Sequence, residues 1–341
     1  AELLGIPYLR VALAAVIPAL LFYLSLFALI DFTARKKGIG TCTMDETSQD
    51  KKLWPSAHLF IPILVVVFYI VRGYSPTMAA TWGCVAGLVI NVFRRETRLT
   101  PTKIGHIIQA TGRQASTVAI PIASIGIIIG VAIQSNLAMK FSSKLMLISG
   151  GSLIASLFVI ILGCIILGMG LPTVAAYIMG AVFFAPPLVK FGMIPLAAHF
   201  FVFYYSILAM VTPPVALASF TAAGLAEGNI TKTGVRAFVM SFVAFLIPFA
   251  FLFQPVLLWE GALSNILMTA VFSVIGVVVW AAAISGYIGT SLALPLRIFL
   301  ALLALCILLP TGRSITIIAI AGAMITIAVN YHRLAQQRPA M

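Results

Sequence analysis

The sequence predicts an all-α polytopic membrane protein. Hydrophobic residues make up 62% of its 341 positions and charged residues only 9%, and the mean hydropathy is +1.14. A soluble core does not explain such values. The net charge of +13 comes from Lys and Arg residues in short loops between apolar runs, which is typical of membrane topology and not of nucleic-acid binding. Two long uncharged stretches, 145–189 and 191–226, are each interrupted by Gly or Pro.

One membrane span needs roughly 20 apolar residues, so the spans can be assigned in chain order. Uninterrupted spans are expected at 11–32, 55–71, 76–93, 115–134, 235–258, 263–284, 294–309 and 315–329. The stretch 145–189 is about two spans long and must fold back on itself as a hairpin. The stretch 191–226 is closer to one long span with a gap. The pairs Gly83/Gly87 and Gly126/Gly130 have the GxxxG spacing of helix contacts.

Charged loops predict the orientation of these spans. The loop 94–113 contains five basic residues and only Glu96 as an acidic one, so the positive-inside rule makes it cytoplasmic. Counting from this loop places the N-terminus outside and the C-terminal tail inside, in agreement with the basic residues at 35–37 and at Lys232 and Arg236. The segment 102–114 either lies along the inner membrane surface or forms an ordinary loop.

The two interruptions are the candidate binding site. The first contains Gly168, Gly170, Leu171, Pro172 and Thr173, and the second contains Thr212, Pro213 and Pro214. Glycine permits a turn and proline removes an N–H donor, so both breaks expose carbonyl oxygens. With the two Thr hydroxyls, these neutral oxygens suit a monovalent cation such as Na⁺, at Gly170, Thr173 and Thr212. The half-helices expected to start at Val174 and Val215 point positive dipole ends at an anionic substrate.

Bland alternatives exist for these features. Gly and Pro are ordinary in membrane helices, and a kink explains many of them; the pairing of two consecutive breaks favours a site. His199 is a proton-coupling group by its titration range or a packing residue within an aromatic cluster. No acidic residue lies within a span, and the four Cys residues have no metal-type spacing, so we expect no metal centre and no cofactor beyond a coupling Na⁺ or H⁺.

Several motifs resemble a known family. They are the run LGMGLPTVAAY at 167–177, the run AHFFVFY at 198–204, the run TPPVALA at 212–218, and Pro248-Phe249. In order and spacing these are similar to the large membrane subunit of tripartite ATP-independent periplasmic (TRAP) transporters, specifically the fused permeases of the TAXI branch. The resemblance covers most of the chain from 7 to about 261, and the last three spans resemble a C-terminal extension of that branch.

The resemblance implies a secondary transporter with inverted repeats, re-entrant hairpins and an elevator-like movement. The first interruption then corresponds to a hairpin tip (hairpin 145–189), and the second to the unwound part of a broken helix (195–226). Such permeases receive small organic anions from a periplasmic binding protein and use a sodium or proton gradient. The first-repeat hairpin is missing, so the chain resembles the C-terminal half of a permease. The absent initiator Met fits this, although simple Met removal before Ala1 also explains it.

The expected organisation follows from this resemblance. Residues 1–114 form scaffold helices and a cytoplasmic basic loop, 115–261 the second transport repeat, and 262–341 a three-helix extension. We expect a multi-pass protein of the bacterial inner membrane whose partners are the binding protein, the anionic substrate, the lipid bilayer and the missing N-terminal half, with no nucleic acid. Two rival functions remain: an integral membrane enzyme, which needs His or acidic clusters at one face, and a non-transporting assembly subunit.

Overall fold

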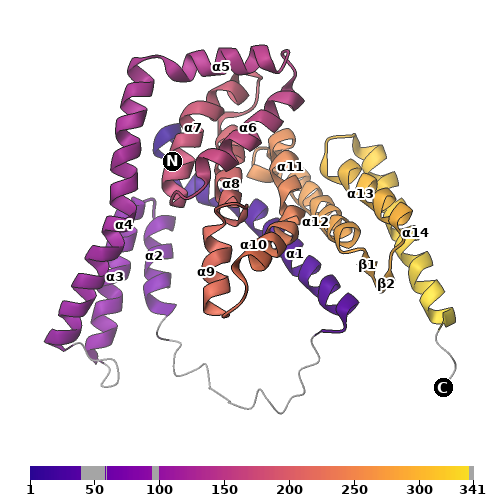
Figure 1. Cartoon of the computed structure of the whole chain (residues 1–341), viewed down its shortest axis with the longest axis horizontal. Coiled ribbons are helices and arrows are strands. Elements are labelled where there is room, and N and C mark those ends of the chain that lie inside the picture. The colour runs from indigo at the N-terminus through magenta and orange to yellow at the C-terminus, as the bar shows by residue number, and fades with distance from the viewer. Residues whose placement is uncertain (40–57, 59, 94–99, 338–341) are drawn as a thin grey trace. The chain divides into compact units, whose positions relative to one another are not determined.

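The computed structural model describes residues 1–39, 58, 60–93 and 100–337, and these are almost entirely helical (Figure 1). The α-helices are α1 (Tyr8–Lys37), α2 (Ile61–Val71), α3 (Pro76–Phe93), α4 (Pro101–Gln134), α5 (Leu137–Ile148), α6 (Leu153–Gly168), α7 (Thr173–Lys190), α8 (Pro195–Leu208), α9 (Leu217–Leu225), α10 (Ile230–Ser241), α11 (Ile247–Phe253), α12 (Leu263–Ser285), α13 (Leu294–Leu308) and α14 (Arg313–Gln337). Short 3₁₀ helices are η1 (Glu2–Leu4), η4 (Ala209–Val211), η5 (Phe242–Leu246) and η6 (Pro255–Leu258). The only strands in the described part are β1 (Tyr287–Ile288) and β2 (Thr290–Ser291), which pair as an antiparallel hairpin.

Within these residues, six helical segments are long and apolar enough to cross a membrane. They are α1, α4, α7, the run from α10 to α11, α12 and most of α14. The prediction of an all-α polytopic membrane protein is therefore confirmed, apart from the two-residue strands. The first part of the span expected at 55–71 and the residues Arg94, Arg95, Glu96, Arg98, Cys42 and Arg338 lie outside the described residues.

The chain divides into two compact units. Unit 1 comprises residues 1–14 and 41–120, and unit 2 comprises residues 15–40 and 121–341. In unit 1, α2 and α3 pack as a helical hairpin, because Gly83 and Gly87 leave room for Pro62 and Val66 of α2. The contact expected at the first GxxxG pair is confirmed, whereas Gly126 and Gly130 have open space at their Cβ positions among the described residues.

The expected loop 94–113 is wrong from Pro101 onward. α4 runs without interruption from Pro101 to Gln134, so the segment 102–114 is also not an ordinary loop. At about 1.5 Å per residue, a helix of 34 residues extends about 51 Å and exceeds a single span. Thr100 provides the start signal, because its hydroxyl accepts a hydrogen bond from the Lys103 N–H at 3.4 Å.

In unit 2, α6 and α7 form an antiparallel helical hairpin. Its pairing follows from small residues: Gly163 faces the ring of Phe184, Gly180 faces the Cys164 sulfur, and Gly168 faces Ala176. Residue numbers rise on one arm as they fall on the other, which only antiparallel helices produce. The hairpin expected over 145–189 instead has arms at 153–168 and 173–190, because a turn at Gly150 and Gly151, both with positive φ, ends α5 at Ile148.

The helix that follows this hairpin is largely buried in unit 2. α8 buries Phe201, Val202 and Tyr205 completely. Pro248 cannot donate to the carbonyl of Ala244 four residues earlier, and the chain there narrows to η5. Tyr204 and Tyr205 of α8 repair the ladder, donating their hydroxyls to the carbonyls of Ala244 at 3.2 Å and Phe245 at 2.7 Å.

The C-terminal helices α12, α13 and α14 pack together around Leu300, Ala304 and Ala323. The β hairpin joins α12 to α13, and Arg297 of α13 closes the end of α12. Its guanidinium donates to the carbonyls of Ala283 and Ile284, both at 2.9 Å. These carbonyls have lost their helical donors at the helix end, and a cation there also complements the helix dipole.

We predict that Arg297→Met destabilises this C-terminal bundle. The substitution leaves two carbonyls without donors at a partly buried helix end, which costs about 2–4 kcal/mol. Thermal unfolding of the purified protein in detergent measures the loss. Arg313→Met is the matched control, because Arg313 is exposed and, within the described residues, makes one side-chain bond, to Asn265 at 3.1 Å. Equal melting temperatures for the two variants would contradict the assigned role.

Candidate functional site

The first break is the tip of the α6–α7 hairpin. α6 ends at Gly168, and Met169 leaves the helix with extended angles of φ −62° and ψ 122°. Gly170 then adopts φ +76°, a left-handed conformation that glycine enters at little cost. Pro172, with φ −58° and ψ 147°, restarts the chain as the N-cap of α7. Gly170 and Pro172 thus let the chain reverse direction between α6 and α7 within the four residues 169–172.

The second break interrupts the helix that begins as α8. α8 ends at Leu208, η4 follows, and Thr212 is extended with φ −93° and ψ 124°. The peptide bond between Pro213 and Pro214 is cis. Because neither proline has an N–H, the helical ladder cannot continue through them. α9 starts at Leu217 and not at Val215 as expected, because Ala216 still has a non-helical ψ of 70°.

The structure places the two breaks against each other. The Thr173 hydroxyl at the start of α7 donates to the Met210 sulfur at 3.2 Å. An added Cβ at Gly168 would lie 2.7 Å from the Ala209 Cβ and 3.2 Å from the Ser206 carbonyl oxygen. Such an approach is possible only for glycine. The hairpin tip and the unwound segment are therefore direct neighbours in unit 2.

Backbone oxygens at both breaks lack internal donors. Among the described residues, no backbone hydrogen bond reaches the carbonyls of Met169, Gly170, Leu171, Thr212, Pro213 or Pro214. This contrasts with the break at Pro248, where two tyrosines repair the ladder. Free carbonyl oxygens at two facing breaks can bind a cation or a water molecule.

The two hydroxyls have the same character. Thr212, of which 7% is exposed, donates to the carbonyl of Leu208 at 2.8 Å, and Thr173 donates to Met210. Each hydroxyl proton is thus committed to a protein acceptor, and the oxygen lone pairs remain available. In that orientation a Thr oxygen can accept a further contact, from a water molecule or from a cation.

Two helices have their N-termini at the breaks. α7 starts at Thr173 and α9 at Leu217, and neither has a side-chain cap. Uncapped N–H groups and the positive end of the helix dipole attract negative charge. Sequence reasoning missed Ser219 in the first turn of α9, whose buried hydroxyl has no hydrogen-bond partner among the described residues. A serine within an apolar run gives no signal of this by itself.

His199 is not part of either break. Its Nδ1 lies 2.9 Å from the Tyr177 hydroxyl, and the two rings meet edge to face at 6.2 Å between centroids. Tyr177 is one helical turn beyond Thr173 on α7, so this pair is a layer adjacent to the breaks. Among the described residues, His199 thus has Tyr177 as its polar partner and lies outside both breaks. Met210, the acceptor for Thr173, was also missed, because an apolar side chain gives no sequence signal.

The described residues contain no group of three or more His, Cys, Asp or Glu side chains that could hold a metal ion. Cys84, Cys164 and Cys306 are free thiols on α3, α6 and α13. The polar groups at the breaks are neutral oxygens and a sulfur. This composition suits a weakly held monovalent ion better than a transition metal.

Comparison with known proteins identifies a family. The model of the family described as "Tripartite ATP-independent periplasmic transporter, DctM component" matches residues 1–266. The match includes both breaks and the whole of α4 to α11, and it ends at the start of α12. No curated protein and no solved structure was found to match the chain.

We predict that Gly168→Val separates the two breaks and lowers stability. Overpacking of a tight site costs about 1–3 kcal/mol, because the new methyls must displace Ala209 or the Ser206 carbonyl. The measurement is the melting temperature in detergent. Gly224→Val is the control: Gly224 lies in α9 with nothing within 4 Å of its Cβ position. A Gly168→Val protein as stable as the control would show that the close approach is not required.

Proposed function

Because the chain belongs to the DctM family of tripartite ATP-independent periplasmic transporters, we propose that it is a TAXI-type permease that takes up small organic anions, chiefly carboxylates, with a sodium gradient. Membership makes it the membrane subunit of a secondary transporter and not an enzyme. The rival hypothesis of a membrane enzyme is therefore wrong, and the subunit is a multi-pass membrane protein.

The observation that carries this proposal is the pair of facing breaks. Discontinuous helices at membrane depth are tolerated where they line a binding cavity, and transporters place their ion and substrate sites there. The open carbonyls around Gly170 and Pro213, together with the Thr173 and Thr212 oxygens, supply several neutral ligands within one region. We assign the coupling cation to these oxygens, with Gly170, Thr173 and Thr212 as its main contributors.

The helix N-termini support an anionic substrate. α7 and α9 both begin at the breaks without side-chain caps, so their N–H groups are available to a carboxylate. The unpartnered Ser219 hydroxyl is a further donor close to the start of α9. A cation on the carbonyl side and a carboxylate on the N–H side would then stabilise each other, which is the simplest physical basis for coupled binding.

Larger features of the mechanism follow as proposals. The α6–α7 hairpin with α8 and α9 forms the second transport repeat, and a first, inverted repeat of the permease completes the site in an elevator-like movement. A periplasmic binding protein delivers the substrate to the permease. We propose the bacterial inner membrane as its location, with the N-terminus of this chain periplasmic and the C-terminus cytoplasmic, on the basis of the basic loops.

We predict that Thr173→Val and Thr212→Val each raise the sodium concentration for half-maximal uptake about tenfold or more. Each substitution keeps the side-chain shape and removes one oxygen, and a single bond to a charged group contributes about 1.5–3 kcal/mol. The measurement is uptake of a labelled carboxylate by the complete transporter in proteoliposomes, with its binding protein, at several sodium concentrations.

The control for this experiment is Thr221→Val. Thr221 on α9 makes the same kind of bond as Thr212, donating to the carbonyl of Leu217 at 2.9 Å, but it is exposed and lies beyond the break. Its sodium dependence should stay unchanged. If uptake by both site variants keeps the original sodium dependence, the assigned cation site is incorrect even if transport itself is confirmed.

A separate substitution distinguishes sodium from proton coupling. We predict that His199→Gln retains sodium-driven uptake within about threefold, because glutamine can still bond the Tyr177 hydroxyl and fill the partly buried space. Uptake is measured with an imposed sodium gradient and, separately, with an imposed pH gradient. If the unmodified transporter responds to the pH gradient and the variant does not, His199 is the coupling group and sodium coupling is refuted.

A further inference from the structure

A second site lies in unit 2, well separated in sequence from the breaks. A groove of about 270 Å³ is formed by the end of α1, the second half of α10 and the end of α12. Its polar lining consists of Thr33, Lys37, Arg236 and Ser285. The rest of the lining is aliphatic, with one thioether side chain. Neither the transport proposal nor the family assignment gives this groove a role.

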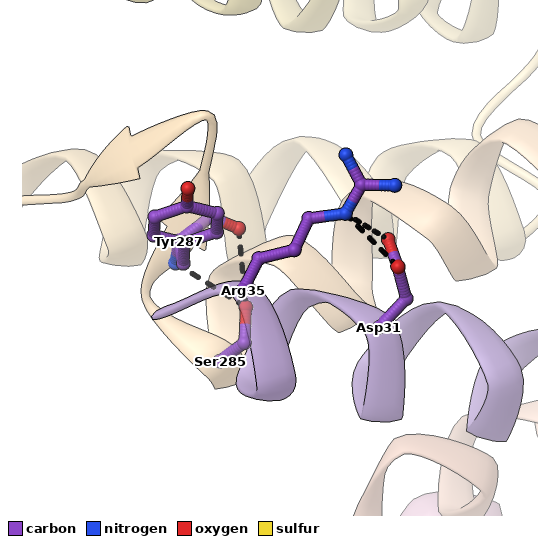
Figure 2. Close-up of polar contacts among 4 residues, drawn as sticks. All are labelled: Asp31, Arg35, Ser285 and Tyr287. Atoms are coloured by element: carbon purple, nitrogen blue, oxygen red, sulfur yellow. Dashed lines mark hydrogen bonds and ion pairs between the residues drawn. The ribbon is translucent and has the colours of Figure 1, made fainter. Parts of the chain in front are cut away.

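The hydrogen-bond acceptors next to the groove are already bonded to other cationic side chains. At the end of α12, Arg297 binds the carbonyls of Ala283 and Ile284, and Lys36 donates to the carbonyl of Ser285 at 2.7 Å. On α1, Asp31 holds Arg35 with a 2.9 Å ion pair, as Figure 2 shows. The exposed helix end and the local carboxylate are therefore both occupied.

Hydroxyl groups near the groove are also engaged. The Ser285 hydroxyl shares its proton between the carbonyls of Ala282 at 3.1 Å and Tyr287 at 3.2 Å. Its oxygen also accepts from the Tyr287 N–H, and Figure 2 shows both contacts with Tyr287. These bonds fix the chain where α12 turns into the β hairpin. The end of α12 beside the groove is thus held by these hydrogen bonds, without a contribution from Lys37 or Arg236.

Lys37 and Arg236 remain as surplus positive charge. Neither has an ion pair or hydrogen bond recorded within the described residues, and both are exposed side chains on different helices that line one groove. Two like charges facing a shared space repel each other unless an anion lies between them. The groove therefore favours a ligand with at least one negative charge.

The walls select the kind of anion. Val235 and Val239 on α10 line the groove beside the cations and leave 49% and 55% of their surface exposed. A small inorganic anion gains nothing from such walls, whereas a lipid covers them with its acyl chain. Basic pockets between membrane helices are known binding places for anionic lipid headgroups.

We propose that this groove binds an anionic phospholipid, with its phosphate between Lys37 and Arg236 and an acyl chain along Val235 and Val239. Thr33 is placed to donate a hydrogen bond to the headgroup. The site joins α1 to α10 and α12 through the lipid. It makes no use of the hairpin tip or of Thr212, so the lipid site and the cation site succeed or fail separately.

The test measures lipid retention by native mass spectrometry of the full-length protein. The protein is loaded with phosphatidylglycerol or with phosphatidylethanolamine of identical acyl chains. We expect preferential retention of phosphatidylglycerol, with a loss of about fivefold for Lys37→Gln or Arg236→Gln and about 30-fold for both together, since each cation contributes independently. A paired Lys140→Gln and Lys144→Gln protein, with the same charge change on α5, should keep the preference.

Three results of the retention measurements would overturn the proposal, and a competition experiment gives a further one. They are equal retention of the two lipids by the unmodified protein, a preference that survives the Lys37→Gln and Arg236→Gln pair, and an equal loss in the α5 control. A fourth arm adds glycerol phosphate, which has the headgroup charge and no chain; if it displaces the lipid at matched concentration, the groove is a site for free phosphate and the proposal fails. The lipid comparison on the unmodified protein decides the matter even if the double variant is unstable.

Discussion

The structure of unit 2 depends on one constraint: a backbone N–H or C=O that leaves its helix inside a membrane must find another partner. Helices satisfy nearly all such groups internally, so each interruption creates a local demand for donors or acceptors. At Pro248 the demand is met by Tyr204 and Tyr205, whose hydroxyls reach across from α8. At the end of α12 it is met by Arg297 and Lys36.

The hairpin tip and the second break are treated differently. Glycine and proline interrupt the helix at both places, yet among the described residues no backbone N–H bonds the carbonyls of the interrupted segments. Small residues then bring the two open segments together, because any Cβ at Gly168 would strike Ala209. Within the described part of this bundle, side chains bond the free carbonyls at Pro248 but not those at the two breaks. This difference distinguishes a purely structural interruption from one that can hold a ligand.

Much of this arrangement could be predicted from the sequence, but not all of it. Local backbone chemistry fixes the helix ends at Pro76, Gly168-Pro172 and Thr212-Pro214. The expected bounds of α3 and the expected positions of both breaks therefore agree with the structure. α4 was missed at its start because basic side chains suggested a loop, although Lys and Arg are good helix formers. The role of Met210 and the isolation of Ser219 depend on tertiary packing, which leaves no periodic signal in an apolar run.

The bond from Thr173 to Met210 has a consequence for how firmly the tip is held. A thioether is a weak acceptor, so the Thr173 hydroxyl loses little hydrogen-bond energy when it exchanges the Met210 sulfur for an oxygen acceptor. The close approach of Gly168 to Ala209 adds van der Waals attraction without a directional bond. Among the described residues, the bond to Met210 is thus the one side-chain hydrogen bond between the tip and the unwound segment, and separating the two costs little polar bonding.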